Sequence, residues 1–429
     1  MTDVDAVNFF RDDEMVADPY PYYEALRAEC PVRREPHENV VMITGYEEAT
    51  AVLNDTATFS SCTAVTGPFP GFPVPLDEYA DGDISDLIAE HRDSLPMSDQ
   101  LPTFDPPTHT DHRGLLMRLI TPKRLKENED FMWRLADRQL DTFVDRGNCE
   151  FINDFASPFA MLVIADLLGV PEDDHARFEE MLLHRPEGGA IGTTESMAHS
   201  PLEHLYREFT AYIEDRRASP REDVLTGLAN ATFPDGSTPE VIDAVRVAAN
   251  LFAAGQETTV RLLGSAVQLI AEDAELQQQL RDNRELIPNF IEESLRTESP
   301  IKGDFRLSRV PTSVGGVDLP AGTTVMLLLA AANRDPRRFD DPATFDVNRA
   351  NARQHISFGR GIHTCPGAPL ARAEARVCLE RLLDRTSDIR ISESHHGPAG
   401  DRRYRYVPTF ILRGLTRLHI EFTPNDGAA

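Results

Sequence analysis

The sequence predicts a mainly α-helical fold that carries small β-sheets. Two observations lead to this fold class. Over most of the 429 residues, apolar side chains recur at the three- and four-residue spacing of an amphipathic helix. Stretches with the apolar pattern of a strand are few and short. A mixture of this kind is typical of helical proteins in which the sheets are minor elements.

The predicted helices have recognisable ends. Gly147 and Gly169 each follow a helical run, and glycine readily takes the left-handed conformation in which helices end. The longest helix is expected from Pro239 to about residue 272, with Thr238 as its capping residue. At ~1.5 Å per residue this helix would be roughly 50 Å long, which is enough to cross a whole domain.

The strand-like stretches cover residues 39–45, 313–329 and 415–422. Residues 62–107 and 184–200 follow neither pattern and are dense in Pro, Gly and polar residues. The first of these irregular stretches also contains several aromatic side chains, which a disordered linker would lack. We therefore favour mobile lids over an apolar site, with disordered linkers as the alternative.

The composition restricts the kind of partner and the compartment. The 43 Lys and Arg residues are outnumbered by 71 Asp and Glu residues, and the net charge of −28 argues against nucleic acid as a partner. The amino-terminal segment lacks the basic start and apolar run of a signal peptide, and no stretch approaches ~18 apolar residues. We expect a cytoplasmic protein without a membrane segment. The five widely spaced cysteines argue against a disulfide framework or a zinc site.

Cys365 stands in the segment FGRGIHTCPG, residues 358–367, among three glycines and one histidine. A nucleophilic cysteine would need an oriented base, and His363 lies on a glycine-rich turn where nothing orients it. A structural thiol would not need three glycines. A metal-bound thiolate would be stabilised by the dipole and the N–H groups of the helix that follows. Gly361 and Gly367 would then let the backbone approach a large, flat group.

The middle of the long helix contains AAGQETT, residues 253–259. A glycine inside a helix costs about 1 kcal/mol relative to alanine. Glu257 beside two threonines is costly in apolar surroundings. The segment is either a solvated helix face with a tolerated glycine or a notch that carries a proton donor and a hydroxyl group, and these residues alone leave both open.

The segment FGRGIHTCPG resembles the haem-binding loop F-x-x-G-x-H/R-x-C-x-G of the cytochrome P450 family. The matching residues are Phe358, Gly361, His363, Cys365 and Gly367. The match is specific because five positions are fixed within ten residues. It implies that Cys365, as a thiolate, is the axial ligand of the iron of haem b (iron protoporphyrin IX) and supplies electron density that favours O–O cleavage.

Three further signatures of the family stand in the expected order. AGQETT, residues 254–259, resembles the acid–threonine segment of the family's long distal helix. Glu293 and Arg296 form its E-x-x-R motif, and Arg349 completes the ion-pair triad of that motif. The resemblance implies a structural role for these three charged residues and no part in the chemistry.

Basic residues outside the cysteine loop also match the family. His109 and Arg113 match a haem-contacting H-x-x-x-R segment, and Arg306 occupies the place of another base. The resemblance implies that these residues and His363 bind the two haem propionates, which would cost several kcal/mol each if buried unpaired. Taken singly, Arg113 would be a surface charge and His109 a core or surface histidine.

The resemblance covers nearly the whole chain. The candidate haem contacts are spread over about 250 residues between His109 and His363, so this part must fold around one cofactor as one unit. We therefore expect one cytochrome P450 domain over residues 1–429, as a monomer, with flexible segments at residues 1–15 and 422–429.

The resemblance implies a monooxygenase that inserts one atom of O2 into a C–H bond (hydroxylation) and releases the other as water. Ala254 and Gly255 would leave room for O2, while Thr258 and Glu257 would deliver protons during its activation. The alternatives are a peroxygenase that uses hydrogen peroxide and a haem-thiolate ligand carrier or sensor without enzymatic activity. Glu257 and Thr258 count against both, because neither would need a proton relay.

Electrons are expected from NAD(P)H through a ferredoxin reductase and a ferredoxin, as in the family's soluble bacterial members. The chain has no room for a flavin or nicotinamide domain of its own. An acidic ferredoxin would need a basic landing area, and the alternative is surface charge without a partner. The candidate bases are Arg118, Lys123, Arg124, Arg360 and Arg372.

Analogy with the family places substrate contacts in the two irregular stretches and in residues 301–305 and 408–412. The candidate pocket residues are Phe69, Phe72, Leu251, Phe305, Phe410 and Ile411. Their composition suggests a small apolar substrate such as a terpenoid, a steroid or an aromatic compound. Lys302 and Asp304 depart from this composition, and they either pair with each other or contact a polar group of the substrate.

Overall fold

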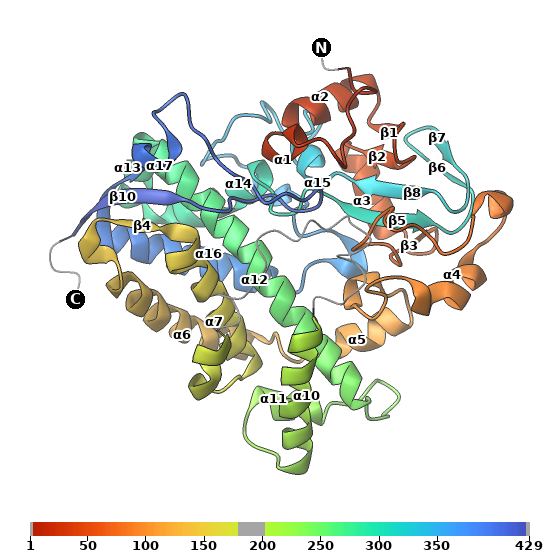
Figure 1. The fold of residues 1–429 in the computed structure, drawn as a ribbon, viewed down its shortest axis with the longest axis horizontal. Coiled ribbons are helices and arrows are strands. Elements are labelled where there is room, and N and C mark those ends of the chain that lie inside the picture. The colour runs from red at the N-terminus through yellow and green to blue at the C-terminus, as the bar shows by residue number, and fades with distance from the viewer. Residues whose placement is uncertain (1–2, 179–201, 426–429) are drawn as a thin grey trace.

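The computed structural model describes residues 3–178 and 202–425. The described residues are mostly helical, with a five-stranded sheet and smaller sheets beside the helices (Figure 1). The fold class predicted from the sequence is thus confirmed. The helices are α1 (Glu14–Ala17), α2 (Tyr20–Glu29), α3 (Tyr46–Asn54), α4 (Ser85–His91), α5 (Thr108–Met117), α6 (Pro122–Asp141), α7 (Ser157–Leu168), α10 (Glu203–Ala218), α11 (Val224–Ala229), α12 (Val241–Glu272), α13 (Ala274–Asp282), α14 (Ile287–Thr297), α15 (Leu329–Ala332), α16 (Ala368–Arg385) and α17 (Glu393–His396).

The long helix α12 crosses the molecule (Figure 1). Its buried side chains belong to the largest hydrophobic cluster of the described residues. It begins at Val241, two residues later than expected from the sequence, and ends at Glu272. Glu240 caps it in place of Thr238, because its side chain and that of Asp243 form a reciprocal capping box with the backbone. The capping box satisfies the first N–H groups, so the preceding residues stay outside the helix.

The prediction that Gly147 and Gly169 end helices is confirmed for only one of them. Gly169 directly follows α7 and has a φ angle of +80°, which is the left-handed helix end predicted from the sequence. Gly147, at +68°, ends a short 3₁₀ turn over Val144–Arg146 rather than α6 itself. The helix α6 already ends at Asp141, so the predicted helix over this region was too long at its carboxyl end.

The strands are β1 (Val32–Arg34), β2 (Val41–Ile43), β3 (Phe59–Ser60), β4 (Asn148–Glu150), β5 (Asp304–Ser308), β6 (Thr312–Val314), β7 (Val317–Leu319), β8 (Thr324–Leu327), β9 (Thr386–Ile391) and β10 (His419–Pro424). The five-stranded sheet has the order β1-β2-β8-β5-β3, in which only β2 and β8 run parallel. The sequence did not predict β5, because its alternation of charged and apolar residues is short. Yet β5 lies inside the sheet and carries Arg306.

The amino-terminal segment differs from the expectation of a flexible end. Val4, Phe9 and Met15 are buried, and they belong to a hydrophobic cluster that also contains Phe305. At the other end, β10 continues to Pro424, so the segment expected to be flexible from residue 422 begins inside a strand. Residues 426–429 lie outside the described part of the chain.

The two irregular stretches have different outcomes. Residues 62–107 contain the helix α4 and several 3₁₀ turns, with irregular backbone between them. Residues 184–200 lie outside the described residues. Among the residues that are described, no helix is both long enough and apolar enough to span a bilayer.

Candidate functional site

Cys365 lies between a 3₁₀ turn and the first residue of α16. Its N–H donates to the carbonyl of Phe358 (2.8 Å), which closes the loop over the cysteine. Burial raises the pKa of the Cys365 thiol, while N–H groups of Gly367 and Ala368 and the nearby Arg113 guanidinium act in the opposite direction. A partly buried sulfur held by helix N–H groups and a cation is suited to become a thiolate once a metal ion binds it.

Gly361 has a structural reason of its own in this loop. Its φ angle is +69°, and a Cβ atom there would lie 2.6 Å from the backbone oxygen of Leu53, the penultimate residue of α3. Only glycine therefore lets the cysteine loop approach α3 this closely. Gly367 is open on its Cys365 side, where a Cβ atom would stand 3.8 Å from the sulfur.

Four basic side chains from distant parts of the chain meet beside the cysteine loop. The rings of His109 and His363 lie 4.2 Å apart between their centres. Burial, followed by the charges of Arg306, His109 and Arg113, lowers the pKa of His363 to about 3. His363 Nε2 also lies 3.1 Å from the hydroxyl of Ser61. The structure therefore brings together the four bases that the sequence resemblance assigned to propionate binding.

These bases meet few acids of the chain itself. Asp304 lies 2.9 Å from Arg306, and Asp105, which acts on His109, is bound at 2.7 Å by Arg309. The Nε2 atom of His109 is buried and has no hydrogen-bond partner among the described residues. A group with two carboxylates would supply the missing acceptors and avoid the cost of unpaired buried bases. The residues present therefore fit a haem whose propionates lie here.

The segment AAGQETT, predicted either as a solvated face or as a proton-delivering notch, lies inside the continuous helix α12, and we call it the α12 notch. The Thr258 hydroxyl donates to the Ala254 carbonyl one turn earlier (2.8 Å), and Ala254 is exposed although it lies midway along a core helix. The Glu257 carboxylate lies 3.4 Å from the Arg261 guanidinium on the next turn. An acid and a hydroxyl group thus stand at adjacent positions in the middle of α12.

Gly255 serves the packing of α12 against α7. A Cβ atom at this position would lie 3.2 Å from Cδ1 of Ile164, which belongs to α7. The glycine thus lets the two helices approach closely. The sequence resemblance assigned Gly255 to a space for O2, and that role stays a prediction, whereas the contact with Ile164 is a packing reason that the structure shows.

Glu293, Arg296 and Arg349 form the ion-pair triad predicted from the sequence. Glu293 Oε1 is 2.7 Å from Arg296 and 2.9 Å from Arg349, and the first pair is completely buried. Burial acts to raise the pKa of Glu293, but hydrogen bonds from both arginines lower it overall. Arg296 also donates to the carbonyls of Asn333 and Pro342, so the triad fixes the chain that leads to the cysteine loop.

Three candidate substrate residues pack into an aromatic cluster with a fourth ring that the sequence did not suggest. Phe10, from the amino-terminal segment, lies 5.2 Å from Phe410 and 5.7 Å from Phe69. Phe305 is fully buried on the same cluster, 6.0 Å from Phe410. Phe10 was missed because it lies outside every segment that the family resemblance marks.

The other candidate substrate residues lie apart. Phe72 contacts His91 at 5.9 Å between ring centres and belongs to a separate small cluster. Leu251 is buried on α12 one turn before Ala254, and Ile411 is half-buried beside the aromatic cluster.

Lys302 and Asp304 do not form an ion pair with each other. Asp304 pairs with Arg306, whereas the Lys302 ammonium donates to the carbonyl of Met15 (3.3 Å) and lies 6.0 Å from the ring of Phe9. Burial, followed by the charge of Arg413, lowers the pKa of Lys302 to about 7. Lys302 thus tethers the amino-terminal segment to the sheet.

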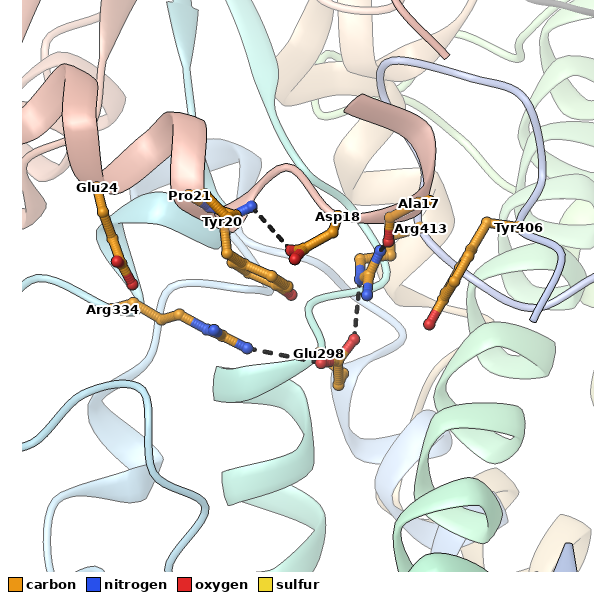
Figure 2. A pocket seen from close by; sticks show the side chains of 9 residues that line it. All are labelled: Ala17, Asp18, Tyr20, Pro21, Glu24, Glu298, Arg334, Tyr406 and Arg413. Carbon is orange, nitrogen blue, oxygen red and sulfur yellow. Dashed lines mark hydrogen bonds and ion pairs between the residues drawn. The ribbon is translucent and has the colours of Figure 1, made fainter. Parts of the chain in front are cut away.

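A polar pocket of about 440 Å³ lies where the amino- and carboxyl-terminal segments meet (Figure 2). Glu298 accepts from Arg413 at 2.8 Å and lies 3.5 Å from Arg334. Both arginines also contact the ring of Tyr20, Arg334 at 3.4 Å. Both arginines pair with Glu298 of the chain itself, so these residues hold the two terminal segments together. We call Tyr20, Glu298, Arg334 and Arg413 the clasp.

Comparison with known proteins assigns the chain to a family. The cytochrome P450 family model matches residues 195–387. The chain is 33% identical over 428 residues to cytochrome P450 144 of Mycobacterium tuberculosis, covering 98% of this chain and 92% of that protein. It therefore belongs to the cytochrome P450 family and is a haem-thiolate monooxygenase, an oxidoreductase that uses O2.

Solved structures agree in fold over the whole chain. The chain is 56% identical to Mycobacterium marinum cytochrome P450 CYP150A6 in its substrate-free form, with a TM-score of 0.92 that covers 99% of this chain and all of the other. CYP109E1 from Bacillus megaterium in complex with testosterone is 27% identical, with a TM-score of 0.76 over 94% of this chain and 99% of the other.

Proposed function

We propose that this monooxygenase binds haem b through the Cys365 thiolate and inserts one oxygen atom into a C–H bond of a small apolar molecule. The observation that carries the proposal is the meeting of four bases beside the partly buried Cys365, which directly precedes α16. When bound, the haem would supply the iron at which dioxygen is activated. The remaining steps depend on residues of the chain.

On the cysteine side, the chain would hold the cofactor by charge and by helix geometry. N–H groups of Gly367 and Ala368 would stabilise the negative sulfur. His109, Arg113 and Arg306 would donate to the propionates, with the Asp304 pair of Arg306 adjusting to the added carboxylate.

On the α12 side, two residues would manage protons. The Thr258 hydroxyl, which donates to the Ala254 carbonyl, would turn toward the space beside exposed Ala254 and hold a proton there at Oγ1. The Glu257 carboxyl group would replace that proton from the solvent side, since its side chain is 35% exposed. Both residues belong to the continuous helix α12, so their backbone positions are fixed relative to each other.

The substrate proposal is an apolar molecule of terpenoid, steroid or aromatic type. The aromatic cluster supports it through Phe10 and Phe69, which are half-buried and would favour an apolar ligand, while Phe305 and Phe410 are buried behind them. The similar CYP109E1 was solved with testosterone, which is a steroid. Screening such compounds for a shift of the haem absorption band would identify the substrate class.

For electron delivery we propose a ferredoxin and its NAD(P)H-dependent reductase. Lys123, whose side chain is 87% exposed and lies 3.7 Å from Glu127, supports a basic docking area together with exposed Arg118. Arg360 belongs to the cysteine loop itself. The other two candidate bases already interact with groups of the protein. Arg372 is held by Glu292 at 2.6 Å, and Arg124 donates to carbonyl groups at the end of α7.

The test begins with cofactor binding. The purified protein is expected to give the carbon monoxide difference spectrum of a haem-thiolate protein, and Cys365→Ala to lose it. With ferredoxin, reductase and NADH, Thr258→Ala is expected to form product about 100-fold more slowly while still consuming NADH and releasing hydrogen peroxide. Full turnover with hydrogen peroxide alone would instead identify a peroxygenase, and NADH-independent ligand binding without product would identify a carrier or sensor.

A further inference from the structure

The acid of the α12 notch has a cationic neighbour that no sequence signature includes. Arg261 follows Glu257 by four residues, so both side chains lie on one face of α12. Their charged groups are 3.4 Å apart, and the Arg261 side chain is only 8% exposed whereas that of Glu257 is 35% exposed. The arginine is thus the fixed member of the pair and the glutamate the accessible one.

The carboxyl-terminal segment holds Arg261 in place. A Cβ atom at Gly414 would lie 2.5 Å from Cγ and 2.8 Å from Cβ of Arg261, so only glycine can occupy this position without moving the arginine. The Gly414 backbone is itself fixed, because its carbonyl accepts from Val407 (3.0 Å) and the neighbouring Arg413 N–H donates to Pro300 (2.9 Å). The aliphatic stem of Arg261 therefore lies between α12 and a fixed backbone.

We propose that Arg261 is a positioning residue for the Glu257 carboxylate and that Gly414 provides the space this positioning requires. The inference rests on the proposed role of Glu257 in proton delivery. A glutamate side chain has several rotamers on an exposed helix face, and selecting one of them costs conformational entropy. An arginine whose stem cannot move offers its guanidinium at one place, and it thereby keeps Glu257 in one orientation before each proton transfer.

The contact with Gly414 also links the notch to the candidate substrate region. The same segment carries Phe410 and Ile411 a few residues earlier, and residues 411 and 413 bond to the chain beside β5. Arg261 therefore lies at the contact between the helix that carries the proton donor and a segment that contributes to the aromatic cluster.

The experiment compares variants of the holoenzyme that keep the helix intact. The set is Arg261→Gln, Arg261→Lys, Glu257→Gln and the double variant Glu257→Gln with Arg261→Gln. The matched control is Arg402→Gln, because Arg402 pairs at 3.5 Å with Glu272 at the end of the same helix and has similar exposure (15% and 33%). The readouts are product formed per NADH, the solvent deuterium isotope effect on product formation, and urea unfolding of all variants as a double-mutant cycle.

Arg261→Gln is expected to lower product per NADH about 10-fold and to raise the solvent isotope effect, with an unchanged carbon monoxide spectrum. Arg261→Lys restores most of the product yield, because it keeps a cation at the same position. The double variant adds nothing to the loss caused by Glu257→Gln, and the unfolding cycle shows coupling between the two residues. Arg402→Gln is expected to form as much product per NADH as the wild type, since it affects only the end of the helix.

Three outcomes would overturn the proposal. If Glu257→Gln lowers the product yield but Arg261→Gln does not, the proton relay stands and the positioning role of Arg261 is wrong. If the unfolding cycle shows no coupling between the two residues, their pairing is wrong. If Glu257→Gln leaves both product yield and isotope effect unchanged, the proposed relay fails and the positioning role fails with it.

Discussion

Two regions of the molecule gather basic side chains, and they differ in what faces those bases. At the junction of the terminal segments, Arg334 and Arg413 share the carboxylate of Glu298 and contact the ring of Tyr20 (Figure 2). Burial and the Glu298 charge raise the pKa of Tyr20 to about 12, so the tyrosine stays neutral between the two cations. Both arginines of this region thus lie beside a carboxylate supplied by the chain.

Beside Cys365 the balance is different. Arg113 donates to a backbone carbonyl, Thr364 (2.5 Å), and His109 keeps one buried ring nitrogen without a hydrogen-bond partner among the described residues. Arg306 alone has a close carboxylate, that of Asp304. His109 and Arg113 thus keep donor groups that the carboxylates of a ligand would accept. The difference separates a structural clasp from a cofactor site.

The largest expected effect is a loss of haem affinity, and it comes from the basic residues beside Cys365. Replacing Arg113 and Arg306 together by leucine removes two charged contacts to the propionates, each worth about 2 kcal/mol. The total of about 4 kcal/mol corresponds to an affinity for haem that is lower by roughly 1000-fold. The rate of haem transfer to an excess of apomyoglobin measures this loss directly.

The matched control makes the same chemical change in the other region. Arg334→Leu with Arg413→Leu also removes one buried and one partly buried arginine, but we expect haem transfer at the wild-type rate from the folded protein. A variant without Arg113 and Arg306 that retains haem as tightly as the wild type would show that these bases do not bind the propionates.

The second effect is on stability and belongs to the clasp. Arg413→Leu leaves Glu298 with the more distant Arg334 and removes the hydrogen bond to the Ala17 carbonyl (2.7 Å). We expect the free energy of unfolding to fall by about 3 kcal/mol, because a partly buried carboxylate loses its closest cation. Urea unfolding at neutral pH checks this value. If the folded variant loses haem, Arg413 also contributes to haem binding, and the proposed difference between the two regions is wrong.

Much of the site could be predicted because the family's motifs are local. The loop around Cys365 and the notch around Thr258 are short segments with characteristic residues, and Glu293 and Arg296 lie within one helical turn. Arg306 was assigned correctly to the base cluster although β5 itself was not predicted, since its motif position did not depend on the strand. Local sequence patterns thus located residues whose secondary structure they did not reveal.

The missed features depend on contacts between distant parts of the chain. Phe10 joins the aromatic cluster from the amino-terminal segment, which its polar composition suggested was flexible. Gly414 contacts the side chain of Arg261 and restricts its position, although the two residues are more than 150 positions apart in sequence. No local pattern marks either residue. Lys302 and Asp304 are near neighbours in sequence, yet their side chains find different partners on different elements.

The smallest effect concerns Lys302, a buried base that pairs with no acid among the described residues. Its pKa of about 7 lies below the ordinary value of 10.5 because burial disfavours the charged form. The unfolded chain therefore binds this proton up to about pH 10.5 and the folded chain only up to about pH 7. The free energy of unfolding contributed by Lys302 is lowest below pH 7 and rises between these two values.

Lys302→Met removes the buried charge and keeps a side chain of similar length. We expect the variant to be more stable than the wild type by about 2 kcal/mol at pH 6, since loss of the Met15 hydrogen bond offsets part of the gain. The advantage should shrink steadily as the pH rises from about 7 toward 10. Thermal unfolding at pH 6 and pH 9.5 measures both values, and a pH-independent difference would mean that an anion absent from the chain neutralises Lys302, as we infer for the bases beside Cys365.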